Sequence, residues 1–350
     1  MCRTTLNAQR TTLKRTPLFD LHRAAGGRLV PFAGYEMPVQ YAGILAERQA
    51  VREAAGIFDV SHMGQAHLHS TSSFRKLSRS PEKAEIGAAL YALIMRPDGG
   101  IVDDCIFYRH DDRFWTVVLN ASRQEIDLEI LSDATPLPTR AMIALQGPKA
   151  VAMIGEICPR RRFVADLEVL GVRIAVACRT GYTGEDGYEF MLEAEEAPRL
   201  WRKLIELGAA PCGLGARDLL RLEAGLPLYG HEMDETTNPW ETGLGFAVDL
   251  EREDDFEARS ALTQLKDSPR RRAGLKVVKG AIPRTDCPVV DAGGREIGIV
   301  TSGAFSPILD SGIALARIER SAAPAAVRIR GTDCHAEEVP LPFYRRRRSA

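Results

Sequence analysis

The sequence predicts an α+β protein that ends in a small β-barrel. Segments with helical periodicity and segments that read as strands both occur in the first 265 residues, with a run of three consecutive strands among them. Short strand-like pieces split by Gly and Pro fill the end of the chain. With 350 residues, 45% of them hydrophobic, the chain can bury a large core and divide into two or three domains.

Two helices and a meander of strands are predicted in the long first region. Apolar residues recur at helical spacing over 47–55 and 197–207, and the stripe from Leu200 to Ile205 in the second helix predicts a side that faces the core. Between residues 90 and 120, the turns RPDGG and HDDR separate AALYALIM, IVDDCIFY and FWTVVLN. We therefore expect an antiparallel meander there.

A domain boundary is predicted around residues 264–274, where the chain reads TQLKDSPRRRAG and becomes polar. Beyond it, short strands are expected in GLKVV, CPVVDAGGREIGIVTSG, GIALARI, AAVRIRG and EEVPLPFY, a pattern typical of a small barrel. The expected division is a disordered tail at 1–13, an α+β region at 14–265 and a barrel domain at 270–348.

The composition limits the cellular setting and the class of partner. No run of about 18 apolar residues occurs, and MCRTTLNAQRTTLKR lacks the apolar core of a secretory signal. That segment has no acids and faintly resembles an organelle transit peptide, but we favour a bacterial tail. Seven scattered Cys without a CxxC spacing predict reduced thiols in a cytoplasmic compartment; a mitochondrial matrix is the alternative.

The last part of the chain is basic. From Lys266 to Ala350 there are sixteen Lys and Arg against nine Asp and Glu, a net charge of +7. Such a lobe can attract a polyanionic ligand or an acidic partner protein, although we favour the alternative that these residues are solvated surface charge. The basic residues are not interleaved with stacking aromatics, so nucleic acid is not an expected partner.

The stretch RTGYTGEDGYE, residues 179–189, combines three Gly with several acids. Its glycines indicate a backbone that turns sharply or approaches a ligand closely, and Tyr182 and Tyr188 can stack on a flat ring. Glu189 begins the apolar strand YEFML, where a carboxylate on a rigid element can pair bidentately with a ring that offers adjacent N–H donors, such as a pterin. A hairpin turn with solvated acids explains the same residues.

Two adjacent acids interrupt the apolar strand GGIVDDCIFY. Side chains alternate along a strand, so Asp103 and Asp104 must point to opposite faces, and each has apolar neighbours that would raise its carboxyl pKa if it were buried. Alternation does not decide which acid enters a functional site. An edge strand whose charge blocks aggregation is the alternative.

An arginine near the start of a helix marks GLGARDLLRLEAGLPLYGHEMDETTNPWETGL. Arg217 lies in the first helical turn, where a positive charge opposes the macrodipole, so a carboxylate or a ligand is expected beside it. Pairing with Asp218 or Glu223 remains open. The acidic loop HEMDETTNP does not fit the EF-hand spacing, so no metal site is predicted.

Taken together, several segments resemble one known family. FAGYEMPVQY, FDVSHMGQ, GGIVDDCIFY, ALQGPKA, RTGYTGEDGYE, GLGARDLLRLEAGLPLYGHEMDETTNPWETGL and VTSGAFSP are similar to the T-protein of the glycine cleavage system, the tetrahydrofolate-dependent aminomethyltransferase. The matches occur in the family's order from about Thr16 to about Tyr344, which is nearly the whole chain.

The resemblance implies a three-lobed fold and a reaction. Two α+β lobes, intertwined in sequence, would form the folate-binding aminomethyltransferase region at 14–265 around a central channel, with the barrel as the third lobe. The implied reaction of glycine catabolism transfers the methylene carbon of a lipoyl-bound aminomethyl group to tetrahydrofolate. It releases ammonia and forms 5,10-methylenetetrahydrofolate. Tetrahydrofolate is the expected co-substrate, and the lipoylated carrier, H-protein, is the expected partner.

The resemblance also implies roles for individual residues. Asp104, the second acid of the GG-x-x-DD motif, corresponds to the catalytic carboxylate beside the folate nitrogens, and Glu189 to the acid that grips the pterin amino edge. A fixed anion can orient the nucleophilic nitrogen, accept its proton and stabilise positive charge as ammonia leaves. The other folate-binding positions implied are Arg217, Tyr91, Asn120, Tyr182 and Met63.

Departures from the family pattern leave two other functions to consider. The segment from His69 to Tyr91 is shorter than the family's, which would shift Tyr91, and Leu226 replaces an aromatic-like residue. A folate-dependent demethylase of a small methyl donor would keep the folate pocket without a carrier. A non-catalytic folate-binding protein of iron–sulfur assembly would carry K-x-C-x-x-G-Q, but HEMDETTNPWETG has no Cys.

Overall fold

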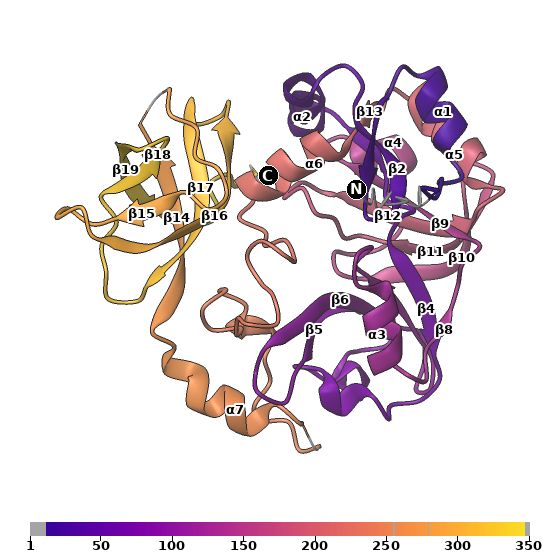
Figure 1. The fold of residues 1–350 in the computed structure, drawn as a ribbon. Helices are drawn as coiled ribbons and strands as arrows, with labels where there is room; N and C mark the ends of the chain where they lie inside the picture. Colours follow the sequence, from indigo (N-terminus) through magenta and orange to yellow (C-terminus); the bar gives the residue numbers. More distant parts are fainter. Residues whose placement is uncertain (1–11, 255, 279, 347–350) are drawn as a thin grey trace, which may run out of the picture.

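The structure, a computed structural model, describes residues 12–254, 256–278 and 280–346. The chain forms three bodies arranged in a triangle (Figure 1): a first lobe on a six-stranded sheet, a second lobe on a five-stranded sheet, and a closed barrel. This arrangement confirms the α+β class with a C-terminal barrel. Most of the expected N-terminal tail, residues 1–11, lies outside the described residues.

The first lobe takes its strands from three separate parts of the chain. In sheet order these strands are β10 (Phe163–Val169), β11 (Val172–Cys178), β12 (Gly187–Glu193), β9 (Arg140–Gln146), β3 (Gly56–Asp59) and β13 (Ala210–Cys212). All neighbours are antiparallel except β3 and β13. The ribbon β1 (Arg28–Phe32) and β2 (Tyr35–Gln40) and the helices α1 (Phe19–Ala24), α2 (Ile44–Glu53), α4 (Ala150–Ile154), α5 (Ala197–Glu206) and α6 (Leu214–Glu223) belong to the same lobe.

Helix α5 matches the predicted periodicity with one correction. Leu200, Trp201 and Leu204 are buried in the main core of the first lobe, as expected. Ile205 is 36% exposed, because the helix lies on the sheet along a stripe too narrow to include that position. Gly208 follows the helix with a positive φ of 97°, which explains why the helix ends there.

The second lobe contains the predicted meander. Its sheet order is β5 (Ala89–Met95), β6 (Ile101–Arg109), β7 (Trp115–Leu119), β4 (Gly64–Leu68) and β8 (Thr135–Pro136). Around it lie α3 (Gln124–Ile130), α7 (Arg259–Gln264) and the short 3-10 helices η1 (Phe74–Lys76), η2 (Pro81–Lys83), η3 (Gly245–Ala247) and η4 (Leu265–Asp267). The chain enters this lobe after β3 and returns to the first lobe at β9, so the two lobes are intertwined in sequence.

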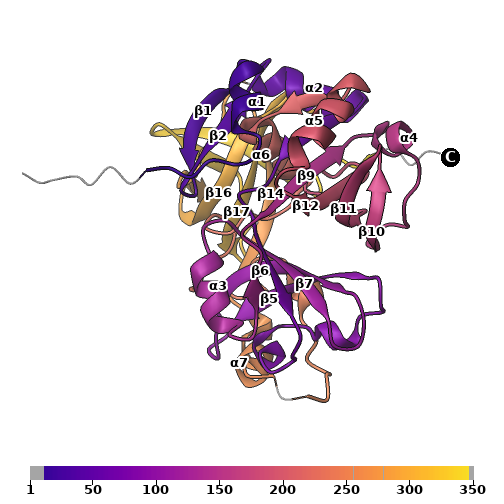
Figure 2. The same ribbon diagram turned by 90° about the vertical axis from the view of Figure 1, so that its right-hand side faces the viewer.

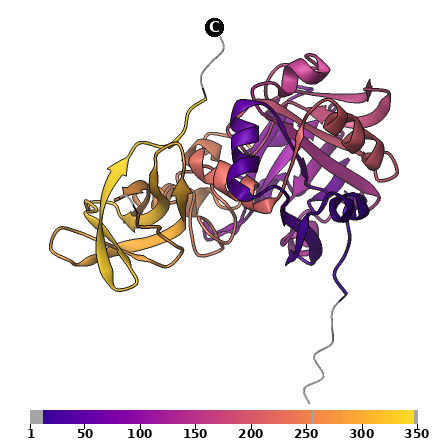
Figure 3. The same ribbon diagram turned by 90° about the horizontal axis from the view of Figure 1, so that it is seen from above.

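The barrel closes on itself in the order β14 (Arg270–Val277), β17 (Ser311–Glu319), β16 (Glu296–Ser306), β15 (Pro288–Val290), β18 (Ala326–Ile329) and β19 (Thr332–Val339), with β19 paired to β14. Closure leaves no unpaired sheet edge. Viewed from above (Figure 3), the barrel lies beside both lobes. Its outer residues Ile313 and Leu315 pack with Leu222 of α6, which anchors the barrel to the first lobe.

A shared core lies between the two lobes. The two sheets lie one above the other (Figure 2), and residues of both meet in one cluster that includes Phe58 and Met191 from the first sheet and Tyr108 and Val118 from the second. Residues on this inner side of β6 are therefore close to residues on β12 and its preceding loop. No helix among the described residues is long and apolar enough to cross a bilayer.

Candidate active site

Strand β6 separates its two acids as alternation predicts. Asp103 is fully buried on the face whose Cys105 and Phe107 belong to the core of the second lobe. Asp104 is half-buried on the opposite face, where Ile106 contacts the core between the lobes. Because β6 is paired on both sides, with β5 and β7, it is not an edge strand, and the aggregation-blocking interpretation is wrong.

Asn120, directly after β7, joins the two acids. Its side-chain amide nitrogen donates to Asp104 Oδ1 at 2.8 Å and to Asp103 Oδ1 at 2.8 Å, and its backbone N–H donates to Asp103 Oδ2 at 3.3 Å. One residue thus fixes the positions of two carboxyl groups that lie on opposite faces of the strand.

The surroundings of Asp104 suit a group that exchanges protons near neutral pH. Burial and the neighbouring charge of Asp103 raise the pKa of Asp104 to about 7, although Asn120 and the phenol of Tyr91 favour its ionised form. Tyr182 also lies close enough to interact with the Asp104 charge. The structure therefore brings together four predicted site residues: Tyr91, Asp104, Asn120 and Tyr182.

Tyr91 is on the strand next to that of Asp104. It lies on β5, paired in register with Ile106, and its buried hydroxyl faces Asp104 but does not make a hydrogen bond of normal geometry. Its ring stacks on Phe246 with centroids 6.1 Å apart. Phe246 is 70% exposed, an unusual position for a large aromatic, and the sequence interpretation missed it because a single Phe in GLGFAV carries no pattern.

The loop between β11 and β12 is a hairpin connection, but its acids are not solvated. Glu185 pairs with Arg52, Asp186 pairs with Arg179, and Glu189 is only 5% exposed. The interpretation of a turn with solvated acids is therefore wrong. Instead, opposite charges hold the loop in one conformation.

Close backbone approach explains why this loop needs glycine. A Cβ at Gly181 would lie 1.9 Å from Gln146 Oε1, and a Cβ at Gly187 would lie 2.0 Å from the Leu145 carbonyl oxygen. Gly184 has a φ of +79°, in the left-handed region that favours glycine. Gly181 and Gly187 thus allow the loop to pack against β9, and neither is needed for close approach to a ligand.

Tyr188 and Glu189 are neighbours on β12 with different environments. The expectation that Tyr188 stacks on a ligand is wrong, because its ring is buried in the core of the first lobe. Glu189 lies opposite Cys178 and Ala144, and its Oε2 accepts a hydrogen bond from Thr180 Oγ1 at 2.5 Å. Among the described residues, no hydrogen bond reaches its other oxygen. A buried carboxylate with an oxygen unused by the protein suits a ligand that carries N–H groups.

Arg217 also lacks the protein partner that its charge requires. Glu223 pairs with Arg48 and Asp218 pairs with Arg221, so neither neutralises Arg217, and both of these pairings proposed from the sequence are wrong. Arg217 Nη1 is buried without a hydrogen-bond partner among the described residues. Burial lowers the Arg217 pKa, and the nearby charge of Glu189 opposes this change.

Aromatic rings complete the surroundings of Arg217. Its guanidinium lies over the ring of Tyr182 at 4.9 Å, and the Tyr182 hydroxyl donates to the carbonyl of Pro227. His62 is also within range of the Arg217 charge; it is buried, and burial lowers its pKa to about 4. The sequence interpretation selected the next residue in the SHMG motif, Met63, which is half-buried at the edge of the core between the lobes.

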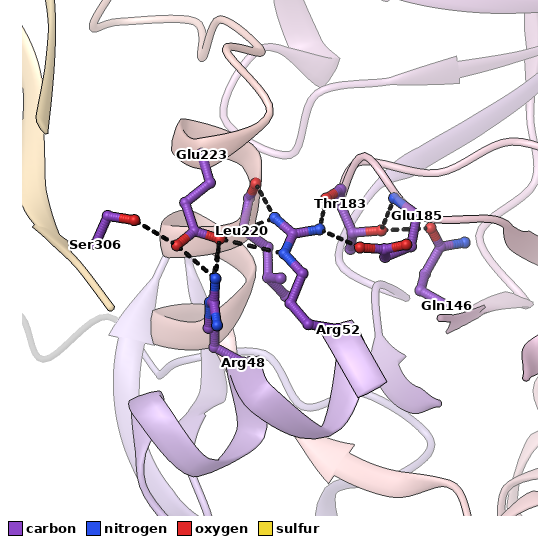
Figure 4. A network of polar contacts seen from close by, with 8 residues as sticks. All are labelled: Arg48, Arg52, Gln146, Thr183, Glu185, Leu220, Glu223 and Ser306. Atoms are coloured by element: carbon purple, nitrogen blue, oxygen red, sulfur yellow. Dashed lines mark hydrogen bonds and ion pairs between the residues drawn. The ribbon is translucent and has the colours of Figure 1, made fainter. Parts of the chain in front are cut away.

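A buried ion network supports the loop from behind (Figure 4). Glu223 of α6 accepts hydrogen bonds from Arg48 and Arg52 of α2, and from Ser306 of the barrel at 2.8 Å. Arg52 also donates hydrogen bonds to the Glu185 carboxylate at 2.8 Å and to the carbonyl of Thr183 at 2.7 Å. The network connects α2, α6, the barrel and the loop that carries Tyr182.

Comparisons with known proteins agree with this architecture. The profile of the GCVT N-terminal domain family matches residues 18–252, and that of the glycine cleavage T-protein C-terminal barrel domain matches residues 270–345. The chain is 45% identical to an aminomethyltransferase of Rubrobacter xylanophilus, over 97% of this chain and 96% of the relative. It is 41% identical to an aminomethyltransferase of Symbiobacterium thermophilum, over 95% and 98% of the two chains.

A solved structure gives the same result for the fold. The glycine cleavage system aminomethyltransferase T of Bartonella henselae superposes with a TM-score of 0.88 at 30% identity, covering 96% of this chain and 99% of the other. Fold, site and relatives together define an enzyme of the aminomethyltransferase class. The chain belongs to the glycine cleavage T-protein family, so the family resemblance and the three-lobed fold expected from it are confirmed.

Proposed function

We propose that this enzyme transfers the methylene carbon of a lipoyl-bound aminomethyl group to tetrahydrofolate. The observation that carries the proposal is the half-buried Asp104, whose pKa is raised to about 7 and whose position is fixed by Asn120. A carboxylate that gains and loses protons near neutral pH suits a reaction that moves protons between amines as ammonia leaves. Family membership supports the reaction class.

Three features fit a bound folate. Glu189 is buried and has an oxygen that can accept ring N–H groups. Within the described part of the chain, a buried nitrogen of Arg217 and the buried hydroxyl of Tyr91 have no hydrogen-bond partner. Folate supplies the amine nitrogens that take up the one-carbon unit. Glu189 would hold the pterin edge and Arg217 and Tyr182 would line its ring, with Asn120, Tyr91 and Met63 completing the surroundings.

In this proposal Asp104 performs the proton chemistry. As an anion it accepts the proton of the attacking nitrogen and stabilises positive charge on the carbon as ammonia departs. Asn120 fixes its orientation with a 2.8 Å hydrogen bond, which limits the reorganisation needed during the reaction. Tyr91 and Tyr182 close the sides of this carboxylate and help to exclude water.

We further propose that the carrier is a lipoylated protein that docks partly by charge. The barrel region carries the basic excess, but several of its arginines are neutralised internally: Arg271 by Glu338, Arg295 by Glu319 and Arg328 by Glu296. Exposed basic residues such as Arg284 and Arg330 make no ion pair among the described residues and remain available to an acidic partner.

We also propose the bounds of the two domains and the location of the protein. The family matches support a folate-binding region at 14–265 and a barrel domain at 270–348. A cytoplasmic location is supported by free thiols at all six cysteines that the structure describes.

The decisive experiment supplies the purified protein with tetrahydrofolate and a carrier whose lipoyl arm bears the aminomethyl group. Ammonia and 5,10-methylenetetrahydrofolate should form in equal amounts, and both should require the carrier. If ammonia is not released while a free small methyl donor is demethylated, the enzyme is instead a folate-dependent demethylase.

A further inference from the structure

A second pair of acids lies behind the candidate active site. Asp103 of β6 and Asp127 of α3 are both fully buried at the core of the second lobe. Helix α3 packs on the Asp103 face of β6, where Leu128 contacts the cluster that contains Cys105. The two carboxyl groups are close enough to affect each other electrostatically. Asp127 in particular carries no sequence signal, because an acid on a short helix normally reads as a solvated residue.

The protein offers this pair too few donors for two negative charges. Both oxygens of Asp127 are buried without a hydrogen-bond partner among the described residues. Arg123, a cation that interacts electrostatically with both acids, directs its hydrogen bonds elsewhere, to the carbonyl of Val102 at 3.1 Å and to Glu235 at 2.7 Å. Two ionised carboxylates facing each other in such a place would be strongly unfavourable, whereas one proton between them gives each a partner.

We propose that Asp103 and Asp127 share a single proton, and that this pair acts as a positioning unit that holds Asn120 and sets how readily Asp104 gives up its proton. Asp103 touches the same Asn120 amide that binds Asp104, with both contacts at 2.8 Å. The pair therefore acts on Asp104 in two ways. It holds the Asn120 amide, and its single negative charge disfavours ionisation of Asp104. The effect on catalysis rests on the proposed function of Asp104.

The charged and titratable surroundings agree with one shared proton. Burial first, and then the charge of Asp127, raise the pKa of Asp103 well above its usual range, while burial raises the pKa of Asp127 to about 6. As in other coupled carboxyl pairs, these values describe the pair rather than one residue. The charged and titratable groups that act on the pair from neighbouring positions are Cys105, Arg123, Tyr229 and Asp104.

Infrared spectroscopy tests the shared proton without any need for turnover. At about pH 9, well above the titration of Asp104, the wild-type protein should still show the C=O stretch of a protonated carboxyl group, sensitive to D2O. Asp104→Asn should keep this band. Asp103→Asn and Asp127→Asn should each lose it, because the new amide can donate to the remaining carboxylate, which then ionises. The shared proton would be disproved if the wild type lacks this band or if both single variants keep it.

The pH dependence of kcat/KM tests the positioning role. The double variant Asp103→Asn/Asp127→Asn removes the charge of the pair, so the acidic limb should move down by about one pH unit. In Asp103→Asn the negative charge of the pair remains on the more distant Asp127, so the acidic limb should move to lower pH by a smaller amount. In Asp127→Asn the negative charge remains on Asp103, so the acidic limb should not move to lower pH. Glu125→Gln, an exposed position on α3, is the matched control. Equal loss of kcat in all three variants without any movement of the limb would mean a purely structural role.

Discussion

Asp103 and Asp104 are chemically identical neighbours on β6, yet the strand gives them different environments. Asp103 points into the core of the second lobe, and Asp104 points toward the first lobe, where Tyr182 and Arg217 are found. A one-residue shift of this strand would exchange the two roles. The bulge between Ile94 and Met95 of β5, where the register with β6 shifts, lies beyond Asp104 and leaves its pairing with Leu93 intact.

Replacing Asp104 tests the role of its carboxylate. Asp104→Asn should lower kcat by about 10² or more while folate binding is largely kept, since it removes a positioned acid–base group but keeps its shape. In the wild type, kcat/KM should fall as the pH drops through about 7, because protonation of Asp104 removes the base. Single-turnover kinetics across pH 5–9 measure both effects, and the exposed Asp112→Asn is the control. Unchanged turnover would contradict this assignment.

Glu189 should act on binding rather than on the chemical step. Glu189→Ala removes the buried acceptor proposed to grip the pterin edge, so the Kd of tetrahydrofolate should rise by at least about tenfold. Fluorescence titration or calorimetry measures this change. Glu168→Ala, on the exposed face of β10, provides a matched control. Identical titrations for the Glu189 variant and the wild type would argue against pterin recognition by this residue.

At the scale of elements, the loop between β11 and β12 depends on α2 and α6 for its shape. Its glycines remove side chains that would collide with β9. Its acid Glu185 is paired with Arg52 of α2, and Asp186 with Arg179 at the start of the loop itself. The loop therefore presents Tyr182 from a fixed backbone, although loops are usually the most mobile parts of a protein.

The buried network of Figure 4 should contribute strongly to stability. Glu223→Gln removes the one carboxylate that pairs with both Arg48 and Arg52. Arg48 then loses the carboxylate that neutralises it and Arg52 keeps only Glu185, so the free energy of unfolding should fall by about 3 kcal/mol. Urea unfolding measures this change. Glu206→Gln, exposed on α5, should change it little. A Glu223→Gln variant as stable as wild type would show that the network is not needed to hold these elements together.

At the scale of the whole molecule, three bodies meet where α6 packs on the barrel and where the two sheets share a core. Besides Ser306, the barrel contributes Ser302, which accepts a hydrogen bond from the buried Arg221, and Thr301, which donates to Glu232 at 2.7 Å. These polar contacts fix the barrel against the helix that carries Arg217. The position of the barrel therefore affects the site.

Carrier binding should depend on salt if the basic barrel region guides it. Raising NaCl from about 0.05 to about 0.5 M should weaken carrier affinity by about tenfold, since exposed charges are screened. The double variant Arg284→Glu/Arg330→Glu should weaken binding at low salt, whereas Arg202→Glu, the same charge change on the exposed side of α5, should not. Affinity that is independent of salt would exclude this surface as an electrostatic docking site.

Much of the fold could be predicted from the sequence because its signals are local. The meander from β5 to β7, helix α5 and the barrel strands follow from hydrophobic periodicity and from turns rich in Gly and Pro. The intertwining of the lobes followed only from the family resemblance, because the pairing of β3 with β9 joins segments that are distant in the chain. Ile205 shows what periodicity does not predict: it indicates which side of a helix faces the core but not how wide the buried stripe is.

For the site, the sequence alone determined which residue types were available: two acids on one strand, an acid after a glycine-rich loop and an arginine at a helix start. Only the tertiary structure decided which of them act together, because burial and partners come from distant segments. It separated Asp104 from Asp103 and brought Asp127 close to Asp103. By pairing Glu223 with Arg48 and Arg52, it also left Arg217 without an ion pair to any residue that the structure describes. Charge, desolvation and hydrogen bonding depend on neighbours in space, and one-dimensional spacing does not specify those neighbours.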